Sequence, residues 1–161
     1  MPTVVKLDEK DIAILDMLCK NSRASTVEIA TNTGLSPDSV ARRIKNMEKD
    51  GVIEHYTIWI NNTMLGQQYF KVLVSLHSID SSSKHEIISY LSAEPKVVYI
   101  VNALGPWQLE MDVEAKSIEE VREIMRRFMK RFASSISDYT TLSIYDEYKF
   151  RFFERGLFER S

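Results

Sequence analysis

Seven polar or charged side chains follow the Ser36-Pro37 pair at spacings that leave them on the outside of a helix. Val40, Ile44 and Met47 recur at i, i+4 and i+7, which is the pattern of one buried helical stripe. The side chains left outside that stripe are Asp38, Ser39, Arg42, Arg43, Lys45, Asn46 and Lys49. Hydrogen-bond donors and acceptors gathered on one helical face suit the edges of base pairs in the major groove of double-stranded DNA. The stretch therefore predicts a helix that reads DNA.

The residues before this helix carry the signals of a second helix joined to it by a tight turn. Ser25 and Glu28 have the S-x-x-E spacing of a capping box, in which each side chain bonds the amide of the other residue. Gly34 supplies a residue that tolerates positive φ after a helix end. Ser36 is a favoured N-cap, and Pro37 fits the first helical position because no amide hydrogen is needed there. Two capped helices with a sharp turn between them predict a helix-turn-helix.

A preceding helix is expected to support this pair. Asp8 can cap a helix that ends near Lys20 and whose inner side includes Leu15 and either Leu18 or Cys19. Because Cys19 is the only cysteine, no internal disulfide can form. Its place on the apolar side predicts a small buried side chain.

From Val52 onward the pattern becomes that of an α+β domain. The run Val52–Ile60 is β-branched and aromatic, and it predicts a strand. Alternating runs then predict the order β-α-β-β-α-β, the ferredoxin-like arrangement, whose sheet has one face under two helices and one open face. An open apolar face favours self-association. The strands are expected at about 69–79, 96–104, 108–115 and 138–148, with helices after Ser81 and Ser117.

These elements predict two domains with a connection between them. The fold class is α+β, with a winged-helix-like helix-turn-helix domain joined by a strand linker to a βαββαβ domain. The expected boundaries are 1–52 for the helix-turn-helix domain, 53–66 for the strand linker or hinge, and 67–161 for the ligand-binding and oligomerisation domain with a C-terminal extension.

Composition excludes some classes of protein and leaves others open. The chain has 161 residues, 44% of them hydrophobic, and a formal net charge of −2. Residues 1–60 hold eight Lys and Arg against nine Asp and Glu, so the strong electrostatic signature of a nucleic-acid-binding domain is absent, and the polar helix face also fits ordinary solvated surface. The apolar runs are shorter than the roughly 20 residues that cross a membrane. We expect a cytoplasmic protein with no membrane partner and no cofactor.

The order of the parts resembles the leucine-responsive regulator (Lrp)/AsnC family, the feast/famine transcription regulators of bacteria and archaea. The residues that carry the resemblance are Leu7-Asp8, Ile12, Leu15, Asn21 to Ser25, Gly34-Leu35-Ser36, Val40, Arg43-Ile44, Gly51-Val52-Ile53, Leu65-Gly66 and Gly105. The resemblance extends over nearly the whole chain. It implies that the first domain binds DNA, and that the second forms dimers or octamers and binds a small effector, commonly an amino acid, between subunits.

The resemblance makes residues 37–49 the recognition helix. The implied DNA-binding residues are Arg23, Ser25, Thr26, Pro37, Asp38, Ser39, Arg42, Arg43, Lys45 and Asn46. Arg42 or Arg43 can pair with guanine O6 and N7, and Arg43 can instead bind phosphate or brace the helix. Asp38 can accept from cytosine or simply complement the helix dipole, and Ser25 can be a phosphate contact or an ordinary cap. Two DNA-binding domains paired in a dimer imply pseudo-palindromic half-sites about one helical turn, or a multiple of it, apart.

The implied effector loop departs from the family pattern. Members usually read Gly-x-Tyr-Asp or Gly-x-Phe-Asp, where this chain reads Gly105-Pro106-Trp107-Gln108. Gln108 is neutral, so it cannot form the charge-assisted bond that a carboxylate makes with the ammonium group of an amino acid. The candidate effector contacts are Gly105, Trp107, Gln108, Thr140 and Thr141, with interface packing as the alternative for Trp107. We expect any effector to differ from an ordinary free amino acid.

Two other functions are compatible with this plan. Siroheme decarboxylases share the two-domain arrangement, but their chemistry needs histidines gathered about a tetrapyrrole, and His55, His77 and His85 fall on separate elements. The sequence is therefore interpreted as a non-enzyme. An oligomeric partner that does not bind DNA is favoured if Asp38 and Glu48 keep the helix away from phosphates.

The last residues, 146–158, run past the usual end of the family and interleave aromatic with charged side chains. Such interleaving occurs in nucleic-acid-binding segments, but the acids here match the bases. We expect an extension at a subunit interface.

Overall fold

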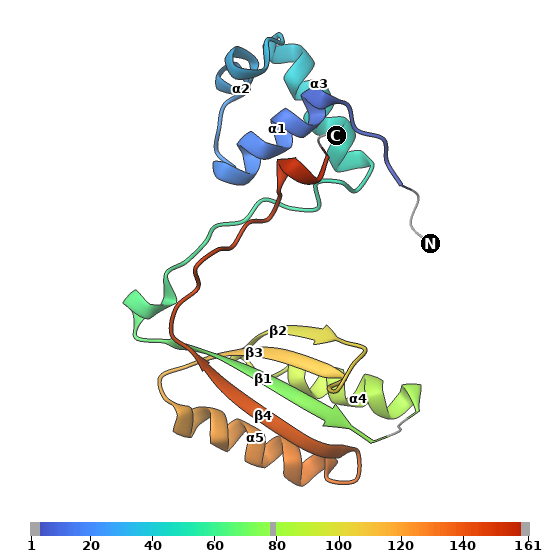
Figure 1. The fold of residues 1–161 in the computed structure, drawn as a ribbon, viewed down its shortest axis with the longest axis vertical. Coiled ribbons are helices and arrows are strands. Elements are labelled where there is room, and N and C mark those ends of the chain that lie inside the picture. The colour runs from blue at the N-terminus through green and yellow to red at the C-terminus, as the bar shows by residue number, and fades with distance from the viewer. Residues whose placement is uncertain (1–3, 78–79, 159–161) are drawn as a thin grey trace. The chain divides into compact units, whose positions relative to one another are not determined.

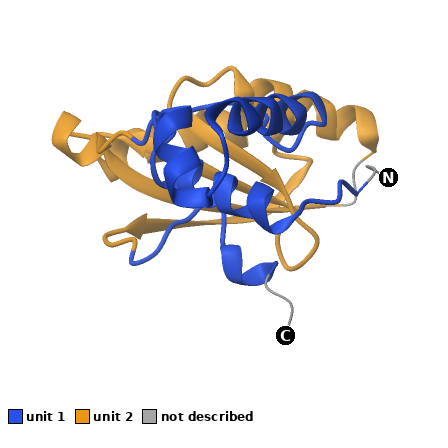
Figure 2. Ribbon diagram, turned by 90° about the horizontal axis from the view of Figure 1, so that it is seen from above, with its two compact units in different colours: residues 1–59, 148–161 blue, residues 60–147 orange. Residues whose placement is uncertain are grey.

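The computed structural model describes residues 4–77 and 80–158 and divides the chain into two compact units (Figure 2). The first unit combines residues 1–59 with residues 148–161, and the second comprises residues 60–147. Each unit has its own hydrophobic core. The C-terminal segment thus groups with the helix-turn-helix, whereas the sequence placed it in the second domain.

The first unit is built on three helices, α1 (Glu9–Lys20), α2 (Thr26–Thr33) and α3 (Pro37–Lys49), as Figure 1 shows. Its buried core consists of Ile14, Leu15, Leu18, Ile29, Ala30, Val40 and Met47. The stripe predicted for α3 is confirmed, because Val40 and Met47 are buried and Ile44 packs half-buried at its edge.

Cys19 is exposed, so the prediction that it is buried was wrong. The inner side of α1 is filled by Ile14, Leu15 and Leu18. One residue beyond Leu18, the helix has turned by about 100°, and Cys19 points to solvent.

Helix starts in this unit are capped, with the reciprocal box at α1 rather than at α2. The Asp8 carboxylate accepts from the amides of Lys10 and Asp11, each at 2.9 Å, and the Asp11 carboxylate accepts from the Asp8 amide at 3.1 Å. At α2, Ser25 Oγ accepts from the Glu28 amide at 3.1 Å. The return bond from Glu28 is missing among the described contacts, so only half of the predicted box forms.

Residues 54–61 are extended but are not a strand, which corrects the expectation for Val52–Ile60. Gly51, at φ +72°, turns the chain out of α3. A strand needs a neighbour that accepts and donates ladder hydrogen bonds, and the described part of the chain offers this segment none. A short 3-10 helix, η1 (Asn62–Leu65), follows.

The second unit has the predicted β-α-β-β-α-β order. Its elements are β1 (Gln68–Leu76), α4 (Ser81–Ser92), β2 (Val97–Asn102), β3 (Leu109–Ala115), α5 (Ile118–Phe132) and β4 (Ile136–Ile144). The four strands form one antiparallel sheet in the order β2-β3-β1-β4. The last strand begins earlier than expected, since Ile136 already pairs with Leu76. It also ends earlier, because Tyr145 to Tyr148 lie outside the sheet.

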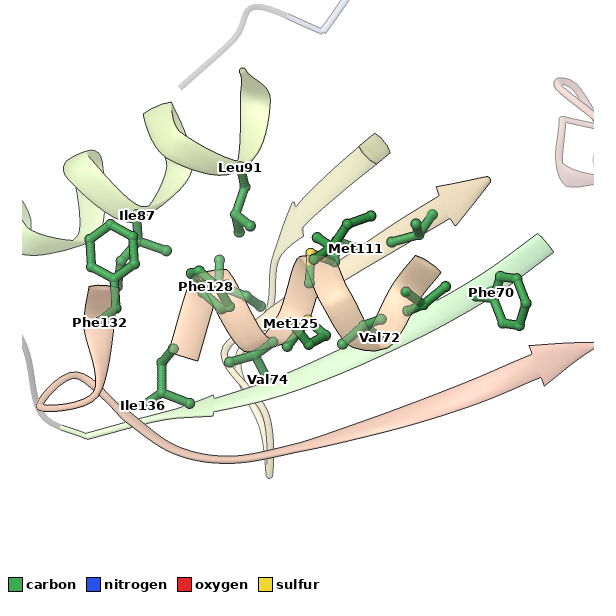
Figure 3. Packing of buried hydrophobic residues seen from close by; sticks show 14 of the residues in the cluster. Phe70, Val72, Val74, Ile87, Leu91, Met111, Met125, Phe128, Phe132 and Ile136 are labelled. Atoms are coloured by element: carbon green, nitrogen blue, oxygen red, sulfur yellow. The ribbon is translucent and has the colours of Figure 1, made fainter. Parts of the chain in front are cut away.

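Helices α4 and α5 cover one face of this sheet (Figure 3). Phe70, Val72 and Val74 alternate along β1 and are buried; Val72 and Val74 lie beside Met125 of α5, and Phe70 lies farther along the strand. The strongly amphipathic pattern of α5 accounts for this packing, since its apolar residues recur every three or four positions. None of the helices in the described ranges has the length and hydrophobicity of a membrane span.

The opposite face of the sheet carries a cluster of charged side chains. Lys71 Nζ contacts the carboxylates of Glu110 and Asp112, the latter at 2.9 Å. The Tyr69 hydroxyl donates to Asp112 Oδ2 at 2.5 Å. Burial, together with this bond to Asp112, raises the pKa of Tyr69. The cluster ties β1 to β3 on the face that no helix of this unit covers.

Candidate DNA-binding surface and effector loop

The turn between α2 and α3 is held by the residues that the sequence singled out. Gly34 ends α2 in the left-handed region at φ +67°. The Leu35 amide donates to the Ala30 carbonyl at 3.2 Å, and the Leu35 side chain packs against the core. Ser36 Oγ accepts from the Ser39 amide at 3.2 Å, with Pro37 as the first helical residue. These contacts fix where α3 starts.

The outer face of α3 presents side chains that are available to bind another molecule. The exposed residues of this face are Asp38, Arg42, Lys45, Asn46 and Lys49. In residues 4–77 and 80–158 their side chains have no hydrogen-bond or ion-pair partner. A row of unpaired donors and acceptors on a helix that follows a tight turn is the geometry with which such helices approach base edges.

Arg43 differs from its neighbour Arg42, because its guanidinium is already engaged. Arg43 Nη1 lies 2.8 Å from Asp8 Oδ2 and 2.7 Å from Asp11 Oδ1. Its side chain is only 26% exposed. The hydrogen bonds to Asp11 and Asp8 raise the pKa of Arg43. The pairs join α3 to the N-terminal cap of α1, which favours the bracing role over a DNA contact.

The three predicted DNA contacts at the start of α2 also differ in whether their side chains are available. Ser25 Oγ is occupied by its helix-capping bond, and Thr26 is half-buried. Arg23 is exposed, and its guanidinium has no partner among the described residues. Of these three predicted contacts, Arg23 is therefore the one whose side chain is available to a phosphate.

Relatives place this surface in a known family. Residues 7–54 match the winged helix-turn-helix DNA-binding family. The transcriptional regulator LrpA of Pyrococcus abyssi is 41% identical over 121 residues, which cover 74% of this chain and 83% of that protein. The chain belongs to the Lrp/AsnC family. The resemblance is thereby confirmed, and this Lrp/AsnC protein is a DNA-binding transcriptional regulator.

Solved structures of Lrp/AsnC proteins share the fold of about nine-tenths of the chain. B. subtilis LrpC is 26% identical, with a TM-score of 0.76, and the match covers 90% of this chain and 99% of that one. E. coli AsnC matches with a TM-score of 0.78 at 20% identity, covering 92% and 99%. The relatives are named as regulators, so the alternative of an enzyme on this plan has no support from them.

The loop predicted to bind an effector, residues 105–108, is closed by the side chain of Gln108. Gln108 Oε1 accepts from the Leu76 amide at 2.8 Å, and Nε2 donates to the Gly105 carbonyl at 2.8 Å. Ser75 Oγ donates to the Pro106 carbonyl at 2.9 Å. Both ends of the Gln108 amide are thus committed to backbone, and the loop is fastened to the end of β1.

The five candidate effector residues do not all lie on one surface. Thr140 pairs with Leu73 and Thr141 with Val72, so the two threonines point to opposite faces of the sheet. Thr141 shares the helix-covered face with Val72, and Thr140 lies on the open face. Trp107 is half-buried in the loop.

Two charged clusters were missed by sequence reasoning. Asp8 was predicted only as a helix cap and Asp11 was given no role, and nothing in their spacing signals the pairing with Arg43. The second cluster could have been predicted from the sequence. Lys71 lies on the polar side of one predicted strand, Glu110 and Asp112 lie on the polar side of another, and opposite charges on neighbouring strands pair across a sheet. The described histidines are exposed, and no group of His, Cys, Asp and Glu within the described ranges could hold a metal ion.

Proposed function

We propose that this regulator binds pseudo-palindromic DNA with two copies of α3, one from each subunit of a homodimer. The observation that carries the proposal is the row of unpaired side chains on α3, set beside an arginine that is braced against α1. In this proposal Arg42 reads a guanine with a two-pronged hydrogen bond, and Lys45, Asn46 and Asp38 contact neighbouring groups of the groove.

The open face of the sheet is the surface through which we propose that two copies pair. Leu73 lies half-buried on that face between Glu110 of β3 and Thr140 of β4, and Leu142 is 41% exposed there. Covering such residues with a second copy removes apolar surface from water. Pairing also compensates for the slightly negative net charge of a single helix-turn-helix domain, because two linked domains bind one DNA site more tightly than either domain alone. An octamer would be an assembly of such dimers.

Any effector is proposed to be recognised without a carboxylate from the loop. A Neisseria meningitidis regulator of the same fold, 19% identical with a TM-score of 0.81, was solved as a complex with L-Met. In this chain Gln108 offers no charge to an ammonium group, and its amide already bonds Leu76 and Gly105. A thermal-shift screen of the free amino acids is expected to give no stabilisation, and a clear shift with any of them would overturn this part of the proposal.

The proposed site of action is chromosomal DNA in the cytoplasm, without enzymatic activity. An absorbance band typical of a bound tetrapyrrole after purification would contradict the non-enzyme interpretation, and we expect none.

A mobility-shift assay on the DNA upstream of the protein's own gene tests the proposed function. The native chain should prefer that DNA over random sequence, and Arg42→Ala should lose the preference. A matched control is Lys20→Ala, which removes an exposed base from the C-terminal end of α1. Equal binding to both DNAs by the native chain would refute autoregulation through this site.

A further inference from the structure

The C-terminal segment returns to the helix-turn-helix unit and packs onto its core. Phe153 is half-buried against the cluster formed by the three helices. Its ring stacks on that of Phe158, with centroids 5.1 Å apart and an interplanar angle of 14°. Between these two residues in the sequence lies a short 3-10 helix, η2 (Arg155–Leu157), which contacts α1 (Figure 1).

A second set of contacts fastens the same segment to residue 59. The ring of Trp59 stacks on Phe150 at 4.7 Å and meets the edge of Phe152 at 6.2 Å. Phe150 and Phe152 also contact each other edge to face at 4.9 Å. The segment is therefore attached to the first unit at two places, the helical core and the residue that ends the extended run after α3.

The core that Phe153 joins is small. Seven buried residues form it, and all of them are Ile, Leu, Val, Met or Ala. Among the described side chains that form or border this core, only Phe153 is aromatic. A domain of this size buries a low fraction of its surface, so one large side chain is a substantial share of its packing. Helices α1, α2 and α3 thus lack a complete core without residues that lie about a hundred positions later in the chain.

We propose that residues 148–158 form a strap that completes the helix-turn-helix unit, and that stable presentation of α3 depends on it. The strap also carries Lys149 and Arg151, whose cations lie 3.5 and 3.1 Å from the same carboxylate on Glu154. Two cations sharing one anion leave positive charge on the strap. A direct contact of these bases with DNA phosphates is the competing role that the experiment must separate.

Hydrogen exchange on the full-length Phe153→Ala variant tests the strap independently of DNA. Amides of α1 should exchange about tenfold faster or more, while those of β1 should keep their protection, because β1 belongs to the other core. The melting temperature of the first unit should fall by about 5–10 °C. Tyr148→Ala is the matched control, since that ring is 94% exposed and has no ring contact among the described residues. Equal α1 exchange in the two variants would overturn the proposal.

DNA binding distinguishes the strap from a phosphate contact, and this arm rests on the proposed function. Phe153→Ala should weaken binding while the slope of log affinity against log salt stays unchanged. Lys149→Ser combined with Arg151→Ser should change neither affinity nor slope. A slope reduced by about 1–2 in the double variant would assign the segment to phosphate contact instead. If the native chain failed to bind DNA specifically, the proposed function would fall, whereas the exchange result would still decide the strap.

Discussion

Replacing Arg43 by alanine should destabilise the first unit, whereas replacing Arg42 should not. Arg43 joins α3 to the cap of α1 through ion pairs of 2.8 and 2.7 Å with Asp8 and Asp11. Arg42 is exposed and has no partner in the described part of the chain. Two adjacent arginines of the same helix thus have different expected effects, and each is the control for the other.

The loss in free energy of unfolding expected for Arg43→Ala lies between the values for exposed and for buried ion pairs. Exposed pairs contribute about 0–1 kcal/mol, and removing one partner of a buried pair costs about 3–5 kcal/mol. The Asp11 side chain is 15% exposed and that of Asp8 is 55% exposed, so only one of the two pairs is well shielded. We expect Arg43→Ala to lose roughly 1–2 kcal/mol, which lowers the melting temperature of a unit of this size by about 5–15 °C. Arg42→Ala should stay within about 0.5 kcal/mol of the native chain.

Thermal unfolding, combined with DNA binding across a salt series, separates the two roles. Arg42→Ala should weaken specific binding by roughly 5- to 150-fold, the equivalent of about 1–3 kcal/mol for one lost guanine contact. Arg43→Ala, measured well below its melting temperature, should keep the native salt slope. A double-mutant cycle with Asp11→Ala should give a coupling of about 0.5 kcal/mol or more. An Arg43→Ala variant that melts like the native chain and whose salt slope falls by about one would show that Arg43 contacts phosphate and does not brace the helices.

Further predictions concern the loop, the turn and the acid stability of α1. Gln108→Ala removes two hydrogen bonds to backbone and should cost the second unit about 1–3 kcal/mol in urea unfolding, with Gln68→Ala near neutral as its control; equal midpoints would contradict it. Gly34→Ala should cost about 1–2 kcal/mol through φ strain, since its added methyl would lie at an ordinary contact distance of 3.7 Å from Lys10 Nζ, whereas Gly105→Ala, which lacks a positive φ, should cost less. The amide of residue 11, and then the guanidinium of residue 43, lower the pKa of Asp8, so its contribution to stability is present at neutral pH and lost as pH falls from about 5 through the folded pKa. Asp8→Asn should therefore flatten the loss of stability over that pH range, and an unchanged profile would count against it.

Local signals in the sequence predicted most of the fold. Gly34 and Ser36 mark the turn because only a few residue types satisfy positive φ and an unpaired helix amide. The β-α-β-β-α-β order followed from alternation and from the amphipathic pattern of α5. Val52–Ile60 was predicted as a strand because propensity reports a fit to a pleated surface and says nothing about whether a neighbouring strand exists.

Long-range pairing accounts for what the sequence did not predict. The roles of Arg42 and Arg43 were inseparable from spacing, because their difference comes from carboxylates on α1 more than thirty residues away. Gln108 was interpreted through the charge that it lacks, whereas its hydrogen bonds depend on where β1 ends. Phe153 was assigned to a subunit interface because no local pattern tells which core an aromatic segment joins.

Selection of bound sequences from a random pool of double-stranded DNA tests whether two paired α3 helices read DNA. We expect enrichment of a pseudo-palindrome whose half-sites are about one helical turn, or a multiple of it, apart, and loss of that enrichment in Arg42→Ala. Enrichment of a single unpaired half-site, or of no sequence at all, would contradict the claim that paired α3 helices read DNA.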